Sequence, residues 1–262
     1  MKQSFSLKNI FKNEAQKNFS KNSVIKLDNL INKDICHKAC QYVQDNEEKI
    51  IESYKNDKKG LTIDIVNQKK YIKYFEYPLK ENAALFGKFV TSDIFKIAEY
   101  LLGDVVFLKS VELHSRCAQG TLIPPHQDNA YYGLKNAKGL TFYIPINKEL
   151  ADMGGLRYYK NPNTLEVDHI PSDSSGFSLR VSDLNNINFD TFDPNYKAGD
   201  CTIHHARSIH FADHVPINAE RSLVVRLSLY SLNEEVKKGH SEWYKDMIKR
   251  NRNKFSDSLN SQ

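Results

Sequence analysis

Beyond Gly103 the chain consists mostly of short β-prone runs, and this pattern constrains the fold more than any other feature of the sequence. The runs cover residues 105–108, 111–115, 139–146, 155–159, 178–181, 200–204 and 222–232. Several are separated by Gly, Pro, Asn and Asp, which favour turns. Seven or more short strands without intervening helices predict an antiparallel sandwich or jelly roll. We therefore predict a mainly β fold with flanking helices.

Helices are predicted on either side of these runs. Asn32 is suited to cap a helix over about 33–55, because Ile35, Ala39 and Val43 follow it at helical spacing. A second helix is expected from Ser92 to the residues before Gly103, whose position suits a helix end. The predicted closing helix lies at about 233–255.

The length of the chain fits one large β domain with helical additions. It has 262 residues, and single β domains reach this size. We expect a flexible amino-terminal arm over 1–22 and a single domain over 23–262. Within this domain we predict a helical buttress at 23–103, a jelly-roll core at 104–232 and the closing helix.

Charge and hydropathy exclude several partners. The formal net charge is +5, but the lysines are interspersed with Asn and Glu and form no basic stripe with interleaved aromatic residues. No apolar run approaches a membrane span, and the first residues lack the apolar core of a secretion signal. We predict a cytoplasmic protein that binds neither nucleic acid nor membrane. Its four cysteines are read as free thiols.

The segment 124–131 contains the first candidate metal ligands. His126 and Asp128 are two residues apart, so on an extended strand their side chains point to the same side. An imidazole and a carboxylate can then meet one cation. The pair alone is a weak signal, because His-x-Asp also occurs by chance.

A second histidine-rich segment follows at 198–214, where a Gly-Asp turn opens a predicted strand. Two His and one carboxylate that leave coordination positions open form the facial triad of non-haem iron(II) oxygenases. Arg221 lies eleven residues beyond His210. Its planar guanidinium suits the far carboxylate of a dicarboxylic co-substrate. A triad together with such an arginine is much more specific than either part.

These residues together resemble the phytanoyl-CoA dioxygenase superfamily of Fe(II)/2-oxoglutarate-dependent oxygenases. The resemblance covers roughly residues 100–230. The positions that carry it are His126, Asp128, Tyr131, Gly154-Gly-Leu-Arg, Gly199-Asp200, His205, His210 and Arg221. It implies a double-stranded β-helix, which is a jelly-roll, cupin-like barrel whose mouth holds the metal.

The resemblance also implies roles for individual residues. It implies that His126, Asp128 and His210 bind Fe(II) and that Arg221 anchors 2-oxoglutarate. Two further residues, Tyr143 and Gln127, are expected at the co-substrate. From their residue types, Tyr131 and Arg157 are candidates for substrate binding at the mouth, although rim packing or a surface ion pair would also explain them.

Two departures from the family pattern affect these implications. Lys160-Asn-Pro-Asn stands where the family usually has Pro-Gly-Ser-His, so the substrate cannot be carried over. Ala212 replaces a common Ser, which puts one co-substrate hydrogen bond in doubt. Asp128 is retained where related halogenases have a small residue, which favours hydroxylation over halogenation.

The sequence thus predicts an Fe(II)/2-oxoglutarate-dependent dioxygenase that uses O2 to hydroxylate a small, polar or anionic metabolite, with release of succinate and CO2. Epimerisation, desaturation or cyclisation with the same cofactors stays open. A non-redox metal-dependent jelly-roll enzyme is a second class, and a catalytically inactive binding module is a third. Arg221 separates the oxygenase from the non-redox enzyme, which needs no dicarboxylate anchor. The oligomeric state is not readable.

Overall fold

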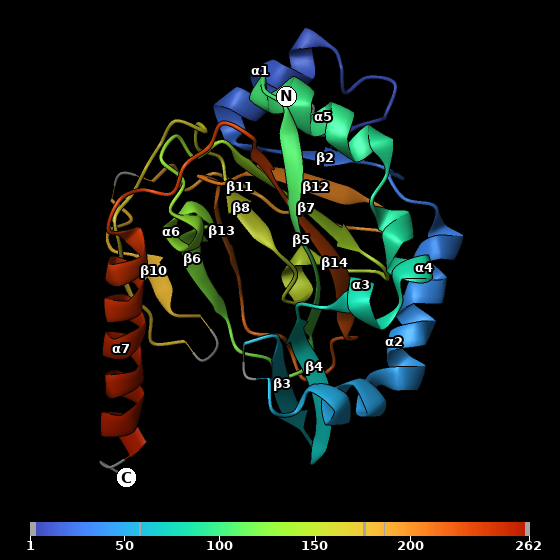
Figure 1. The fold of residues 1–262 in the computed structure, drawn as a ribbon, viewed down its shortest axis with the longest axis vertical. Coiled ribbons are helices and arrows are strands. Elements are labelled where there is room, and N and C mark those ends of the chain that lie inside the picture. The colour runs from blue at the N-terminus through green and yellow to red at the C-terminus, as the bar shows by residue number, and fades with distance from the viewer. Residues whose placement is uncertain (1–3, 58, 175–176, 186, 260–262) are drawn as a thin grey trace.

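The computed structural model describes residues 4–57, 59–174, 177–185 and 187–259 (Figure 1). An eight-stranded sheet has the order β1-β2-β12-β7-β14-β5-β4-β3, and a four-stranded sheet has the order β11-β8-β13-β6. Two further strands, β9 and β10, pair with each other. All described pairings are antiparallel except that of β1 with β2.

The bounds of the elements are as follows. The strands are β1 (Ser4–Phe5), β2 (Val24–Leu27), β3 (Leu61–Val66), β4 (Lys69–Phe75), β5 (Val106–Arg116), β6 (Ile123–Gln127), β7 (Gly139–Pro145), β8 (Arg157–Tyr159), β9 (His169–Pro171), β10 (Leu179–Val181), β11 (Thr191–Phe192), β12 (Cys201–His205), β13 (Ile209–Ala212) and β14 (Ser222–Ser231). The helices are α1 (Asn13–Asn22), α2 (Lys33–Tyr54), α3 (Pro78–Glu81), α4 (Ala83–Phe86), η1 (Gly87–Phe89), α5 (Ser92–Leu102), α6 (Asn129–Tyr132), η2 (Ala151–Met153) and α7 (His240–Leu259).

Alternation along β14 separates two cores. Leu223 and Val225 belong to the main hydrophobic core, which also contains the buried face of α2 and α5. Val224 instead packs with Tyr158 of the four-stranded sheet in a smaller core. Even-numbered side chains of β14 therefore face the space between the two sheets, called here the barrel interior, and odd-numbered ones face the helices.

The two main predicted helices are confirmed, with the caps that the sequence indicated. The side chain of Asn32 accepts a hydrogen bond of 2.7 Å from the backbone N–H of Asp34 at the start of α2. Gly103 ends α5 in the left-handed conformation, with φ of 64°. No helix among the described residues is both long and apolar enough to cross a membrane. All four cysteines are free thiols.

The amino-terminal third differs from the prediction. Within 1–22, which was expected to be a flexible arm, the described residues form β1 and α1. Phe19 on α1 is buried in the main core, so this segment is packed although its sequence is mostly polar. The expected helical buttress over 23–103 also contains strands, because β2, β3 and β4 extend the eight-stranded sheet.

Candidate metal centre

Three of the predicted site residues meet in the barrel interior. His126, Asp128 and His210 are buried, and each offers one ligand atom such that these atoms lie within 4.8 Å of one another. His126 on β6 is the register partner of His210 on β13, and their ring centroids are 4.2 Å apart. Asp128 lies just after β6, where the chain turns into α6. Pairing of β6 with β13 is therefore what brings the distal histidine to the other two residues.

Both histidine rings are oriented by backbone carbonyl groups. Nδ1 of His126 lies 2.8 Å from the carbonyl oxygen of Pro124, and Nδ1 of His210 lies 3.0 Å from that of Ser208. A carbonyl can only accept, so each Nδ1 carries the proton and each Nε2 keeps a free lone pair. Burial lowers the pKa of His126 to about 3 and that of His210 to about 4. Both rings are thus neutral, as a metal ligand requires.

The two carboxylate oxygens of Asp128 have different surroundings. Oδ1 lies 3.7 Å from Nε2 of His210. Oδ2 accepts hydrogen bonds from the Thr141 hydroxyl at 2.7 Å and from Nη2 of Arg226 at 2.8 Å, and Nε2 of His204 lies 3.2 Å away. Burial alone would raise the pKa of Asp128, but Arg226 and His204 hold it well below its ordinary value. The carboxylate is therefore ionised and free on one oxygen only.

Arg226 links this carboxylate to a second one. Its Nη1 donates to Oε2 of Glu112 at 2.8 Å, and its Nη2 also contacts the Tyr132 hydroxyl. Burial would raise the pKa of Glu112, yet Arg226, His114 and Ser110 hold it at about 2. Sequence reasoning attached no site role to Arg226 or Glu112. The signal that could have found Arg226 is its place on the inward face of β14, which the sequence indicates only when the strand's orientation is known.

The predicted co-substrate anchor, Arg221, lies elsewhere. Its guanidinium forms a two-point ion pair with Glu47 of α2, at 2.8 and 2.6 Å, and Nε donates to the hydroxyl of Ser115 at 2.8 Å. It also stacks on the ring of Tyr71, 4.9 Å from the centroid. Position 221 has the parity of the outward face of β14, so its side chain points to the helix layer and away from the metal ligands. The structure does not support this part of the prediction.

The two other expected co-substrate residues also have partners of their own. Gln127 alternates with His126 on β6 and points away from it; its amide donates to the carbonyl groups of Leu165 and Arg207 at 2.8 and 2.6 Å. Tyr143 does lie in the barrel interior, but its hydroxyl contacts both carboxylate oxygens of Glu149 at 3.0–3.1 Å. These hydrogen bonds direct both side chains to partners other than the three candidate ligands.

Of the two predicted substrate residues, one lies beside the three candidate ligands. Tyr131 packs edge-on against His126, with ring centroids 5.5 Å apart, and Phe177 is 5.9 Å from the same ring. Arg157 instead extends from the outer side of β8 to Asp193 and Asp213, with hydrogen bonds of 2.7–2.9 Å. The wall next to His126 is thus aromatic, and the arginine expected there is part of a surface ion-pair network.

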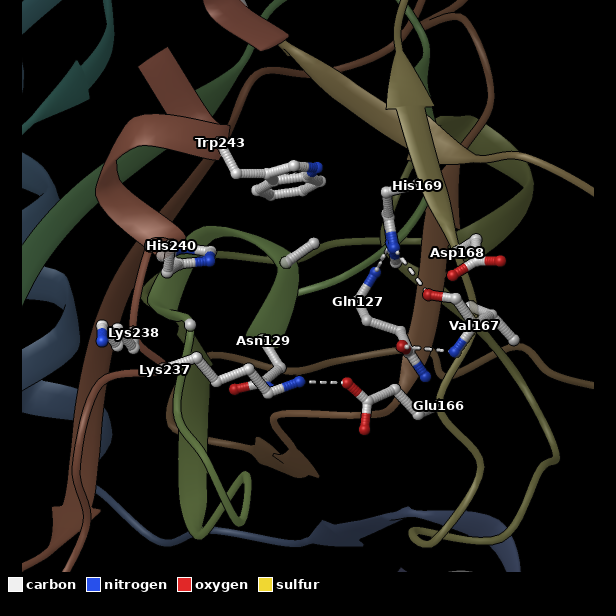
Figure 2. A pocket seen from close by; sticks show the side chains of 13 residues that line it. Gln127, Asn129, Glu166, Val167, Asp168, His169, Lys237, Lys238, His240 and Trp243 are labelled. Carbon is white, nitrogen blue, oxygen red and sulfur yellow. Dashed lines mark hydrogen bonds and ion pairs between the residues drawn. The ribbon is translucent and has the colours of Figure 1, made fainter. Parts of the chain in front are cut away.

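A cavity of about 400 Å³ lies on the other side of β6 (Figure 2). Gln127 and His169 form part of its wall, and Nε2 of His169 accepts the backbone N–H of Gln127 at 3.0 Å. Figure 2 shows Trp243 of α7 over this cavity and Lys237 paired with Glu166 at its rim. The cavity borders the segment that carries two candidate ligands without including any of the three.

The donor set fits a divalent transition metal. Two neutral imidazole nitrogens and one carboxylate oxygen converge, and the hydrogen bonds at their far sides fix each group in place. Among the described residues, the cation in contact with Asp128 is Arg226, whose charge is already shared by Glu112 and Asp128. The residues fit the metal, whereas the anchor that the sequence indicated does not reach it.

Comparison with known proteins places the fold. No protein-family model and no curated protein matches the chain. Among solved structures, EvdO2 from Micromonospora carbonacea var. aurantiaca is similar with a TM-score of 0.67 and 13% identity, over 87% of this chain and 93% of that one. The non-haem α-ketoglutarate-dependent carbocyclase SnoK from nogalamycin biosynthesis gives 0.65 and 14%, over 89% of each chain. EctD from S. alaskensis gives 0.63 and 14%, over 87% and 79%.

These similarities extend over most of the chain but come with low sequence identity, so they establish the fold. The predicted jelly-roll architecture is confirmed by them together with the two facing sheets. The chain therefore has the double-stranded β-helix fold of the non-haem α-ketoglutarate-dependent enzymes.

Proposed function

We propose that the chain is an Fe(II)/2-oxoglutarate-dependent oxygenase that acts on a small-molecule substrate, with His126, Asp128 and His210 as the metal ligands. The observation that carries this proposal is the convergence of two Nε2 atoms and one carboxylate oxygen in the barrel interior, within a fold shared with such enzymes. Three protein ligands on one side of a metal leave positions open for the keto acid and O2.

When bound, iron and 2-oxoglutarate supply the oxidation of a substrate C–H bond by O2, with succinate and CO2 as by-products. The protein's own residues bind and orient these groups. The carbonyls of Pro124 and Ser208 hold the two imidazole rings, and all three ligand side chains are buried. The aromatic rings of Tyr131 and Phe177 then offer aromatic surface to a substrate next to His126.

The same cofactors support several reaction outcomes. Hydroxylation is the simplest result, and the retained Asp128 favours it over halogenation. Two proteins of similar fold are the α-ketoglutarate-dependent epimerase SnoN and the carbocyclase SnoK. Epimerisation and ring closure are therefore alternatives with the same cofactors. We propose hydroxylation as the basic activity.

Anaerobic titration tests the cofactor site. Purified protein receives Fe(II) and then 2-oxoglutarate, and the visible charge-transfer band of a chelated keto acid is recorded. We expect a band in the wild type and in Arg157→Ala, whose side chain lies outside the barrel, and no band in His210→Ala. Metal binding without any band in the wild type would reject the oxygenase and favour a non-redox metalloenzyme.

A further inference from the structure

One oxygen of Asp128 is held by three side chains from three strands of the eight-stranded sheet. Thr141 of β7, His204 of β12 and Arg226 of β14 all lie within 3.2 Å of Oδ2. These strands are neighbours in the sheet, so their inward side chains reach the same point. Side chains of the sheet thus fix the position of Oδ2, whereas Oδ1 faces His210.

A carboxylate has two ways to bind a metal, through one oxygen or through both. A bidentate Asp128 would use a coordination position that a keto acid and O2 require, because the facial triad works by leaving positions open. Hydrogen bonds between an ionised donor and a carboxylate are about twice as strong as neutral ones. The bond from Arg226 to Oδ2 therefore opposes a rotation that would bring both oxygens to the metal.

The surroundings of Arg226 set its role apart from that of a co-substrate anchor. Its two terminal nitrogens are bound to Glu112 and Asp128, at 2.8 Å each. Two buried carboxylates already balance its single charge, so no charge is left over for a third. The structure instead orients the guanidinium, through Glu112, toward the metal ligand.

We propose that Arg226 is a positioning residue that, with Thr141 and His204, restricts Asp128 to binding the metal through Oδ1 alone and so keeps a position open for the keto acid. This inference rests on the proposed function, and it assigns to Arg226 a role in co-substrate binding without contact to the co-substrate. Glu112 holds the guanidinium from the far side.

The test measures binding and needs no turnover. Mn(II) is titrated into the protein by calorimetry, and 2-oxoglutarate is then titrated into the Mn(II)-loaded protein. The variants are Arg226→Met, Arg226→Lys and Thr141→Val. Arg221→Met is the matched arginine control, because Arg221 lies just before the same strand and pairs with Glu47 of α2. Thermal melts confirm that each protein is folded. If Arg226→Met is unstable, Thr141→Val still tests the inference, because this substitution nearly preserves the shape of the side chain.

We expect Mn(II) affinity to stay within about tenfold of the wild type in all variants. Affinity for 2-oxoglutarate should fall about tenfold or more in Arg226→Met. It should fall less in Thr141→Val, recover in part in Arg226→Lys and stay unchanged in Arg221→Met. Unchanged affinity in Arg226→Met would overturn the inference. A loss in Arg226→Met with none in Thr141→Val would also overturn it, because Arg226 would then contact the keto acid itself. A wild type that binds no 2-oxoglutarate would reject the proposed function itself.

Discussion

The buried carboxylate of Glu112 is paired with the guanidinium of Arg226 in the barrel interior. Its carboxylate accepts hydrogen bonds from Arg226 and Ser110 and lies 2.9 Å from Nε2 of His114. The pKa of Glu112 is about 2, below the ordinary 4.5, although burial acts in the opposite direction. The ionised form therefore stabilises the fold, by an amount on the order of 3 kcal/mol.

We predict that Glu112→Gln destabilises the protein more at pH 7 than at pH 3. Because the folded-state pKa is depressed, the contribution of ionised Glu112 is fully present above about 4.5 and is lost as the pH falls toward 2. Guanidinium denaturation of both proteins at the two pH values measures the difference in unfolding free energy. Equal differences at both values would show that the charge of Glu112 contributes nothing.

Arg221 is predicted to act on stability and not on co-substrate binding. Arg221→Ala leaves Glu47 buried without its cation, which should cost about 3–5 kcal/mol of unfolding free energy. Arg157→Ala is the control, because its partners are exposed and its loss should cost at most about 1 kcal/mol. Denaturant unfolding compares the two. Unchanged stability combined with lost 2-oxoglutarate binding would restore the role that the sequence indicated.

For individual residues, the sequence predicted the three candidate ligands but not the side chains that contact them. His126 and Asp128 are local neighbours, and His210 follows from the family pattern. The sequence did not show that the side chain of Arg221 points to Glu47, because a shift of one residue moves every side chain of a strand to its other face, and the sequence does not show which face of β14 is inward. Thr141 and His204 reach Asp128 only through the pairing of strands far apart in the chain.

Elements with strong local signals were predicted well, and those without were not. The helices α2 and α5 have caps and apolar stripes that the sequence displays. The strand β6 was not among the predicted β-prone runs, although the argument for His126 assumed an extended chain there, because its five residues include two prolines, which suit a strand only at an edge. It does lie at the edge of the four-stranded sheet. The strand β4 was also not predicted, because it is rich in Lys and the alternation of apolar and polar residues along it is weak.

The packing of α1 gives a prediction for the segment expected to be flexible. Phe19→Ala should destabilise the protein by about 3–5 kcal/mol, because the side chain is 1% exposed and its loss leaves a cavity. Phe11→Ala is the matched control, since Phe11 is 45% exposed. Thermal or denaturant unfolding measures both. Similar small effects would mean that α1 adds little to the core.

For the whole molecule, metal binding and stability should be linked. A metal that binds only the folded protein at 100 times its dissociation constant adds about 2.7 kcal/mol to the unfolding free energy. For a chain of this size that corresponds to a rise in Tm of roughly 5–10 °C. Calorimetry with Mn(II) and with a chelator measures the shift, and His210→Ala should show none. A shift that persists in this variant would place the metal elsewhere.

The register of β6 with β13 has a consequence for the lifetime of the protein. This pairing joins Ile209 to Gln127 and His210 to His126, and an irregularity follows before Ala212 meets Ile123. An edge strand with two prolines has few backbone hydrogen bonds to hold it. A metal bound by both His126 and His210 would cross-link the two strands, much as a disulfide does in secreted proteins. A metal can be removed, so occupancy of the proposed site would govern the susceptibility of the chain around Pro124 to proteases.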